Sequence, residues 1–199
     1  MRRRQGDKGR RAWPLGALLL LALGGALAAT KEPQEYLDED TAATVTVVGE
    51  PLLFAFARTD LAANVRDYVT LAAAAVDQNG KISYVVISYF WSTVDPRLRH
   101  GPLPPAEPFV LQADDRRIEL HVKGHSAHEA GIGMPVHAPP GDPVTPNVYA
   151  CDLATLRFIA ESRHLSLQAE SNGTDVSYDL WEDRRAALRA FVRHMSGED

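Results

Sequence analysis

Cysteine is nearly absent: Cys151 is the one cysteine among 199 residues. A single thiol excludes a disulfide within the chain, and it excludes zinc and iron–sulfur sites that need several cysteines. The sequence also lacks internal repeats and a run of about 20 apolar residues, the length that a membrane-spanning helix requires. With 45% hydrophobic and 24% charged residues, the composition is that of a globular domain and not of a disordered chain.

Positive charge is scarce after the first 28 residues. Six basic side chains and Asp7 give residues 1–28 a net charge of +5, so the remaining chain carries −10 against −5 for the whole. A surface of that charge repels phosphate backbones, which argues against nucleic acid as a partner. Anionic lipid head groups are disfavoured for the same reason.

The N-terminus has the pattern of a secretory signal peptide. A basic stretch, Arg2–Arg11, precedes an apolar run from Leu15 to Leu27, and Ala26-Leu27-Ala28 matches an A-x-A cleavage site. We therefore predict a signal peptide over 1–28, a mature chain from Ala29 without a membrane span, and a periplasmic or secreted product. The alternative is an uncleaved chain anchored in the inner membrane by the same apolar run.

The remaining chain is predicted to be an exposed lead-in, 29–40, followed by a single globular domain, 41–199. A bent strand is expected over about 43–57, with the bend near Gly49-Glu50-Pro51. Tyr68–Val76 and Lys81–Thr93 flank Asp77-Gln78-Asn79-Gly80, and Asn-Gly is typical of a type I′ hairpin turn. The second arm is apolar on both faces, which indicates a central strand.

Further elements follow a proline-rich connection, 95–108. Two strands are expected around Asp114-Asp115, a short helix over Leu153–Glu161 with Asp152 as N-cap, and a strand at 165–169. Asn172-Gly173 predicts a second hairpin turn. A C-terminal helix is expected to begin with a capping box of Asp179 and Glu182. Its apolar face would carry five residues: Trp181, Leu188, Phe191, Val192 and Met195.

The predicted fold class is α+β, mainly an antiparallel β sandwich or bent sheet with a short helix and a C-terminal helix. Two stretches, 35–46 and 67–71, resemble parts of small exported bacterial proteins of unknown function; the likeness covers about a third of the chain. This resemblance implies a Gram-negative envelope, and it implies no activity.

Four histidines lie close together in the sequence: His121, His125, His128 and His137. Imidazole is the commonest metal ligand, and a loop that gathers three of them can bind Zn(II) or Cu(II). The spacing matches no strong zinc signature, so a merely polar loop is the competing interpretation.

Other patterns point less clearly to chemistry. Gly124-His125-Ser126-Ala127-His128 resembles the hydrolase nucleophile elbow, but its last glycine is missing and no strand-turn-helix context surrounds it. Cys151 precedes a helix N-terminus, which can lower a thiol pKa, although a small buried residue explains it equally. Five aromatic residues form either a ligand surface or core: Tyr68, Tyr84, Tyr89, Phe90 and Trp91.

The sequence thus predicts a non-catalytic envelope protein, a binding or assembly module with an unidentified protein partner and no cofactor. The alternative is a histidine-dependent metal-binding or metal-trafficking protein.

Overall fold

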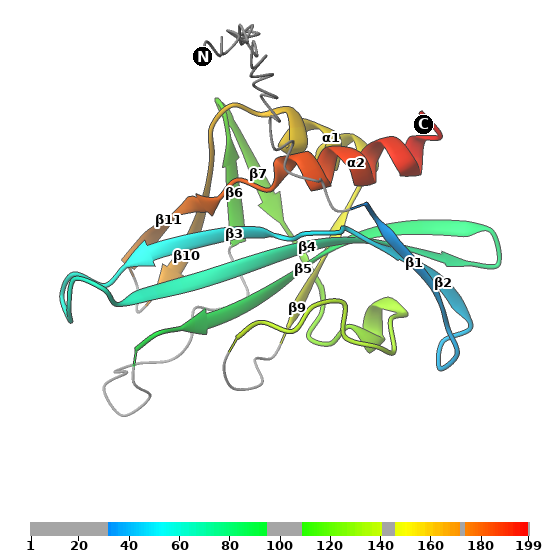
Figure 1. Ribbon diagram of the computed structural model, residues 1–199, viewed down its shortest axis with the longest axis horizontal. Coiled ribbons are helices and arrows are strands. Elements are labelled where there is room, and N and C mark those ends of the chain that lie inside the picture. Colours follow the sequence, from blue (N-terminus) through cyan, green and yellow to red (C-terminus); the bar gives the residue numbers. More distant parts are fainter. Residues whose placement is uncertain (1–31, 95–108, 141–145, 172–173, 199) are drawn as a thin grey trace, which may run out of the picture.

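Figure 1 shows the computed structural model, which describes residues 32–94, 109–140, 146–171 and 174–198. One sheet of eleven strands carries two helices on one side of its long central strands. The predicted α+β class is confirmed, in the form of one bent antiparallel sheet. The predicted signal peptide lies outside the described residues. Within them, no helix combines the length and apolar character needed to cross a membrane.

All the strand pairs among the described residues are antiparallel, and most join strands that are consecutive in the chain. The sheet order is β7-β6-β10-β11-β3-β4-β5-β9-β8, and β2, which pairs with β1, lies against β4 beyond the end of β3. Their bounds are β1 Gln34–Asp38, β2 Ala43–Val47, β3 Leu52–Ala57, β4 Arg66–Gln78, β5 Lys81–Ser92, β6 Phe109–Ala113, β7 Arg116–Leu120, β8 Val122–Gly124, β9 Asn147–Cys151, β10 Leu165–Ser171 and β11 Thr174–Glu182.

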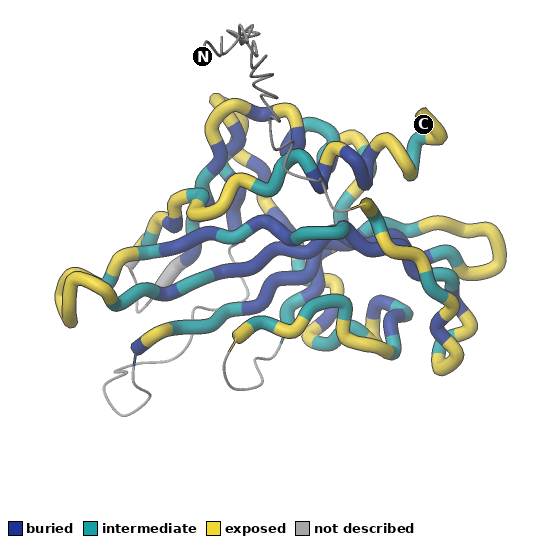
Figure 2. Tube along the Cα trace, in the orientation of Figure 1, coloured by how far each residue is buried: buried dark blue, intermediate teal, exposed yellow. Residues whose placement is uncertain are grey.

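The core lies between the sheet and the two helices, α1 (Leu153–Glu161) and α2 (Arg185–Ser196). Leu71 of β4 and Val86 of β5 line the same small hollow as Leu188 of α2, so these strand residues face the helices. Figure 2 shows the middle of the long strands buried and their tips exposed. Because side chains alternate along a strand, Tyr68 and Thr70 of β4 point away from the helices. We call that side the outer face.

The central hairpin is as predicted. β4 and β5 pair from Gln78↔Lys81 outward, and Asn79 and Gly80 both have positive φ, 58° and 79°. The Asp77 carboxylate accepts a hydrogen bond from the Gly80 amide at 2.8 Å, which holds the turn closed. β5 lies between β4 and β9, so it is the interior strand that its two-sided apolar sequence indicates.

Replacing Gly80 with valine is expected to lower the free energy of unfolding by about 1–3 kcal/mol, because a β-branched residue is strained at positive φ. A Cβ at this position would meet no atom within 4 Å, so the cost is conformational and not steric. Gly80→Asn is the matched control, since asparagine tolerates the left-handed region. Urea unfolding measures both, and an unchanged midpoint for the valine variant would contradict the assignment of strain to this turn.

The short helix is also as predicted. α1 spans Leu153–Glu161, and the Asp152 carboxylate accepts a hydrogen bond from the Thr155 amide at 2.6 Å as its N-cap. The strand expected over 43–57 is interrupted at 48–51, so that β2 and β3 each pair with a different part of β4. Asn172 and Gly173 lie outside the described residues, although the strands on either side of them pair at Ser171↔Thr174.

The predicted start of the C-terminal helix is wrong. Residues 174–182 form strand β11, which pairs with both β10 and β3, and α2 begins only at Arg185, without a side-chain cap. Apolar side chains alternate at Val176, Tyr178 and Leu180, and as a strand this segment pairs with two neighbouring strands. The hydrogen bonds and burial gained by that pairing outweigh those of a local capping box. Asp179 and Glu182 therefore lie in the sheet. The predicted apolar face of the helix is confirmed for Phe191, Leu188 and Val192, which are buried, and Met195 is half-buried. It is wrong for Trp181, which lies in β11 and is exposed.

The lead-in prediction is wrong from Gln34 onward. Residues 34–38 form β1, which pairs with β2, and the side chain of Asp38 is buried although Gln34, Glu35 and Leu37 are exposed. This segment was expected to be solvated because it is polar and acidic. The Asp38 carboxylate is instead bound by four backbone amides: those of Asp40 and Thr41, which are close in the chain, and those of Gly133 and Met134, which lie 95 and 96 residues away.

Candidate functional site

The four candidate metal ligands are spread along the segment between β7 and β9. His121 and His125 are exposed, and the His125 ring lies 3.2 Å from the side-chain oxygen of Asn147. His128 is exposed and begins the 3₁₀ turn η2 (His128–Ala130). The His137 ring is half-buried and packs edge-on against Tyr89 with 5.7 Å between centroids.

The structure does not gather these histidines. In the described part of the chain, no group of three or more His, Cys, Asp or Glu side chains is arranged to hold a metal ion. Burial lowers the pKa of His137, and the charge of Arg184 lowers it further, so this imidazole stays neutral at pH 7. Metal binding by His121, His125, His128 and His137 stays a prediction.

The loop that follows η2 is attached to β1 by one buried carboxylate. Oδ2 of Asp38 accepts hydrogen bonds from the amides of Gly133 at 2.6 Å and Met134 at 3.2 Å. Its Oδ1 accepts from the amides of Asp40 and Thr41 at 3.1 and 3.2 Å. A Cβ on Gly133 would lie 2.8 Å from Oδ1, so the close approach needs glycine here. This carboxylate therefore joins segments 95 residues apart.

Protonation of Asp38 should release this loop. Burial by itself raises the pKa of Asp38, but the amides of Gly133, Met134 and Thr41 together outweigh it, and the net shift is downward. Because the pKa of Asp38 is lower in the folded protein than in the unfolded chain, where it is about 3.9, the ionised carboxylate stabilises the fold at pH values above the unfolded-state pKa. This stabilisation is lost as the pH falls through the folded-state pKa. We expect the Gly133 and Met134 amides to lose hydrogen-exchange protection in acid before those of α1.

The variant Asp38→Asn should accelerate exchange of the same two amides at pH 7, because a neutral acceptor makes weaker hydrogen bonds than a carboxylate. Glu39→Gln, at an exposed neighbouring position, is the control. Hydrogen exchange followed by mass spectrometry or NMR compares them. Unchanged protection of Gly133 in Asp38→Asn would show that the loop is held by other contacts.

The remaining sequence motifs do not assemble into a recognisable reaction centre. Ser126 donates a hydrogen bond to Glu129 at 3.0 Å and accepts one from the Glu129 amide, which makes it part of the η2 turn. Burial raises the pKa of Cys151 to about 11, with the charge of Asp152 acting in the same direction. The thiol therefore stays protonated at neutral pH, whereas a nucleophilic cysteine needs a lowered pKa.

The cavity between sheet and helices is small. It is lined mainly by apolar side chains, among them Leu71, Val86, Leu111 and Ile159, and its free volume is about 20 Å³. That is room for about one water molecule. This cavity therefore offers little space for an organic ligand.

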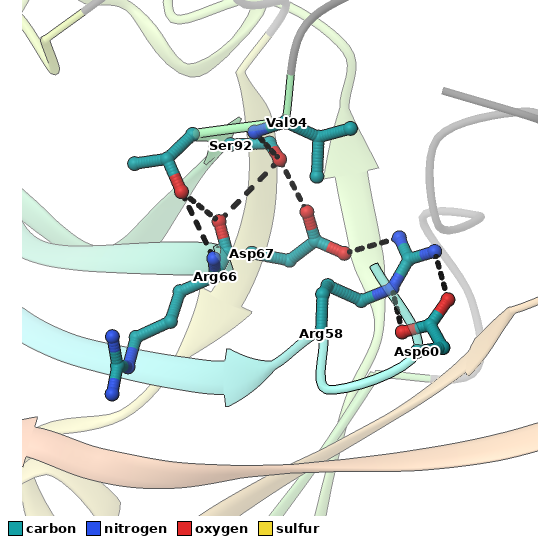
Figure 3. Close-up of polar contacts among 7 residues, drawn as sticks. Arg58, Asp60, Arg66, Asp67, Ser92 and Val94 are labelled. Atoms are coloured by element: carbon teal, nitrogen blue, oxygen red, sulfur yellow. Dashed lines mark hydrogen bonds and ion pairs between the residues drawn. The ribbon is translucent and has the colours of Figure 1, made fainter. Parts of the chain in front are cut away.

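A polar network closes one end of the long hairpin, as Figure 3 shows. The buried Asp67 carboxylate accepts hydrogen bonds from Ser92 and from Arg58, the latter at 3.1 Å, and Arg58 also binds Asp60. The hydroxyl oxygen of Ser92 in turn accepts a hydrogen bond from the Val94 amide at 3.0 Å. Asp67 and Ser92 are directly opposed in the β4–β5 ladder. This network therefore holds β4 and β5 in register next to the following cross-strand pair, Tyr68 and Trp91.

Tyr68, Trp91 and Trp181 form an aromatic cluster on the outer face. The rings of Tyr68 and Trp91 stack with 4.0 Å between centroids and 10° between planes. Trp181 lies at a bulge in β11 and packs edge-on to Tyr68, at 6.4 Å and 80°. The cluster is open to solvent at Trp181, which is 51% exposed.

Arg66 completes the cluster. Its guanidinium carbon lies 4.6 Å from the centre of the Trp181 ring, in cation–π geometry. Figure 3 shows the guanidinium pointing away from the polar network, and the hydrogen bonds of Arg66 in that network come from its backbone. Among the described residues no carboxylate pairs with it.

Comparison with known proteins identifies no relative: no family model matches the chain, and neither a curated protein nor a solved structure does. The site must therefore be judged on its own geometry.

Sequence reasoning found only part of this cluster. It named Tyr68 and Trp91 as aromatic residues for a ligand surface or the core, and Tyr89, which it grouped with them, is in fact buried. A signal for the stack was present, since counting outward from the Asn79–Gly80 turn places Tyr68 opposite Trp91. No comparable signal existed for Trp181, because its neighbours depend on the pairing of β11 with β3.

Proposed function

We propose that this chain is an exported, non-catalytic binding module of a bacterial cell envelope, and that it binds a protein partner through the aromatic cluster. The observation that carries the proposal is the exposure of Trp181 beside a stacked Tyr68–Trp91 pair and Arg66. Tryptophan, tyrosine and arginine are the residues that most often dominate binding energy at protein interfaces.

The remaining surface supports this choice of site. The other large hydrophobic side chains exposed among the described residues are aliphatic: Leu37, Leu61, Ile82 and Met134. Scattered apolar residues of that kind are normal on soluble proteins and need no partner. An exposed tryptophan in contact with an arginine and with Tyr68, which itself stacks on Trp91, is a larger and more continuous feature.

Export is tested by the N-terminus of the native protein. The basic stretch, the 13-residue apolar run and Ala26-Leu27-Ala28 lead us to expect a mature chain that starts at Ala29 or within a residue or two. Mass spectrometry of the protein purified from its native envelope measures this directly. Recovery of intact Met1 in the membrane fraction would contradict a released protein and support the anchored alternative.

Binding is tested by co-sedimentation of the purified protein with washed envelope fractions. We expect Trp181→Ala to weaken the association at least tenfold, the loss typical of a residue that dominates an interface. Leu37→Ala is the matched control, because it removes a more exposed apolar side chain, 66% against 51%, from a different part of the sheet. Association that is absent, or equally strong in both variants, would contradict the proposal.

A further inference from the structure

We infer that the aromatic cluster, Tyr68, Trp91 and Trp181 with Arg66, binds a proline-rich segment of the partner that carries an acidic residue. The inference rests on the proposed function and names the chemistry of the partner. It starts from the hydrogen-bonding groups that the cluster leaves open.

The open polar groups of the cluster are all able to donate. Among the described residues, the indole N–H of Trp181, the hydroxyl of Tyr68 and the guanidinium of Arg66 make no hydrogen bond, whereas the indole of Trp91 donates to Thr70 at 3.1 Å. Indole and guanidinium groups have no acceptor capacity. A ligand that fits must therefore supply acceptors and bring few donors of its own.

A proline-rich segment has that property. Proline lacks a backbone N–H, and the polyproline II helix makes no internal hydrogen bonds, so its carbonyl oxygens remain available. Its rings also pack well on aromatic side chains, which is how several small domains recognise such segments. The rings of Tyr68 and Trp181 meet at 80°, and Trp181, which is 51% exposed, provides a surface for such a ring.

Only part of the backbone beside the cluster is closed to strand addition. At Tyr68, β4 pairs with β3 on one side and with β5 on the other. β5 pairs with β9 only over Tyr84–Ser88, and β11 pairs with β10 only up to Asp179, so among the described residues the strand ends that carry Trp91 and Trp181 have one partner strand each. A partner strand added there would need backbone N–H groups, which the proline peptides lack, so the alanine peptide described below tests that mode of binding.

The positive charge of Arg66 is the reason for including an acidic residue in the proposed ligand. The chain after residue 28 carries −10, yet Arg66 at the cluster has no carboxylate partner among the described residues. Its planar guanidinium can bind a carboxylate through two parallel hydrogen bonds while remaining stacked on Trp181. The overall negative charge of the chain opposes a strongly acidic ligand, so one or two acidic side chains are the best match.

The test uses synthetic nonapeptides and the purified protein. The first peptide consists of prolines around one central glutamate, the second has glutamine in place of the glutamate, and the third has alanines in place of the prolines. Trp91 and Trp181 are two of the three tryptophans of the chain, so intrinsic fluorescence reports on the cluster. We expect the glutamate peptide to bind most tightly and the alanine peptide at least tenfold more weakly.

Three variants assign the contacts. Trp181→Ala should weaken binding of the glutamate peptide at least tenfold, and Trp181→Phe should restore part of it. Arg66→Gln should abolish the preference for glutamate over glutamine while retaining the preference for proline over alanine. Ile82→Ala, at another exposed apolar position, should leave all affinities unchanged. Calorimetry replaces fluorescence for the tryptophan variants, and circular dichroism checks that each variant is folded.

Several results would overturn the inference. These are absence of binding at millimolar peptide, equal affinity for the proline and alanine peptides, and insensitivity to Trp181→Ala. If envelope association depends on Trp181 but no proline peptide binds, the proposed function stands and this inference fails. If that association survives protease treatment of the envelope fraction, the ligand is not a protein segment, and both the protein partner and this inference fail.

Discussion

Replacing Phe191 with alanine is expected to lower the free energy of unfolding by about 3–5 kcal/mol, the usual cost of removing a buried aromatic ring. Phe191 is fully buried on α2, next to Leu188 and Val192, which are almost fully buried. Because the side chain fills space between the helix and the sheet, its loss leaves a cavity that the neighbours cannot refill. Urea unfolding measures the change.

The same measurement separates two roles for the helix. A loss under about 1 kcal/mol would mean that Phe191 is not in the core, since large losses come from core damage of this kind. α2 would then be free to dock a partner through its apolar face. Arg193→Ala, on an exposed position of the same helix, should change the stability by no more than about 0.5 kcal/mol and serves as the control.

Replacing Arg58 with leucine is expected to cost about 3 kcal/mol, the lower end of the range for breaking a buried ion pair. The reason is the carboxylate of Asp67, whose side chain is only 10% exposed and which would lose its cationic partner. Arg58 itself is 24% exposed, so solvent replaces part of the interaction. Urea unfolding at neutral pH measures the loss.

A second substitution tests the origin of this loss. In an Asp67→Asn background, Arg58→Leu should cost clearly less, because no buried charge is left behind. Asp60→Asn removes the exposed partner of Arg58 and should leave stability nearly unchanged. Equal costs of Arg58→Leu in both backgrounds would show that the guanidinium acts through packing and not through Asp67.

Several elements of the fold could be predicted because their signals are local. The Asn79–Gly80 turn sets the register of β4 and β5, and Asp152 caps α1 where the apolar spacing begins. These features depend on φ preferences and on hydrogen bonds that span three residues. Interactions between residues that are close in the sequence are sufficient to form them, and the register of the β4–β5 hairpin by itself places Tyr68 opposite Trp91.

Other elements were decided by partners that are distant in the sequence. Asp38 belongs to an acidic run typical of a solvated tail, and its burial depends on the distant amides of Gly133 and Met134 in addition to the local amides of Asp40 and Thr41. Trp181 lies within the capping-box pattern of Asp179 and Glu182 and has helical spacing to the apolar residues after it. Pairing with β3 and β10 places its segment in the sheet, since each paired strand gains hydrogen bonds and burial along its whole length.

The sequence by itself determined the α+β class, the central hairpin, α1 and the acidity of the chain after residue 28, because each depends on composition or on neighbouring residues. Only the tertiary structure decided where the aromatic cluster is completed and that the histidines do not come together. Both outcomes depend on which strands pair across large separations in the chain. Such pairing is a collective result of burying the whole sheet, and no single segment encodes it.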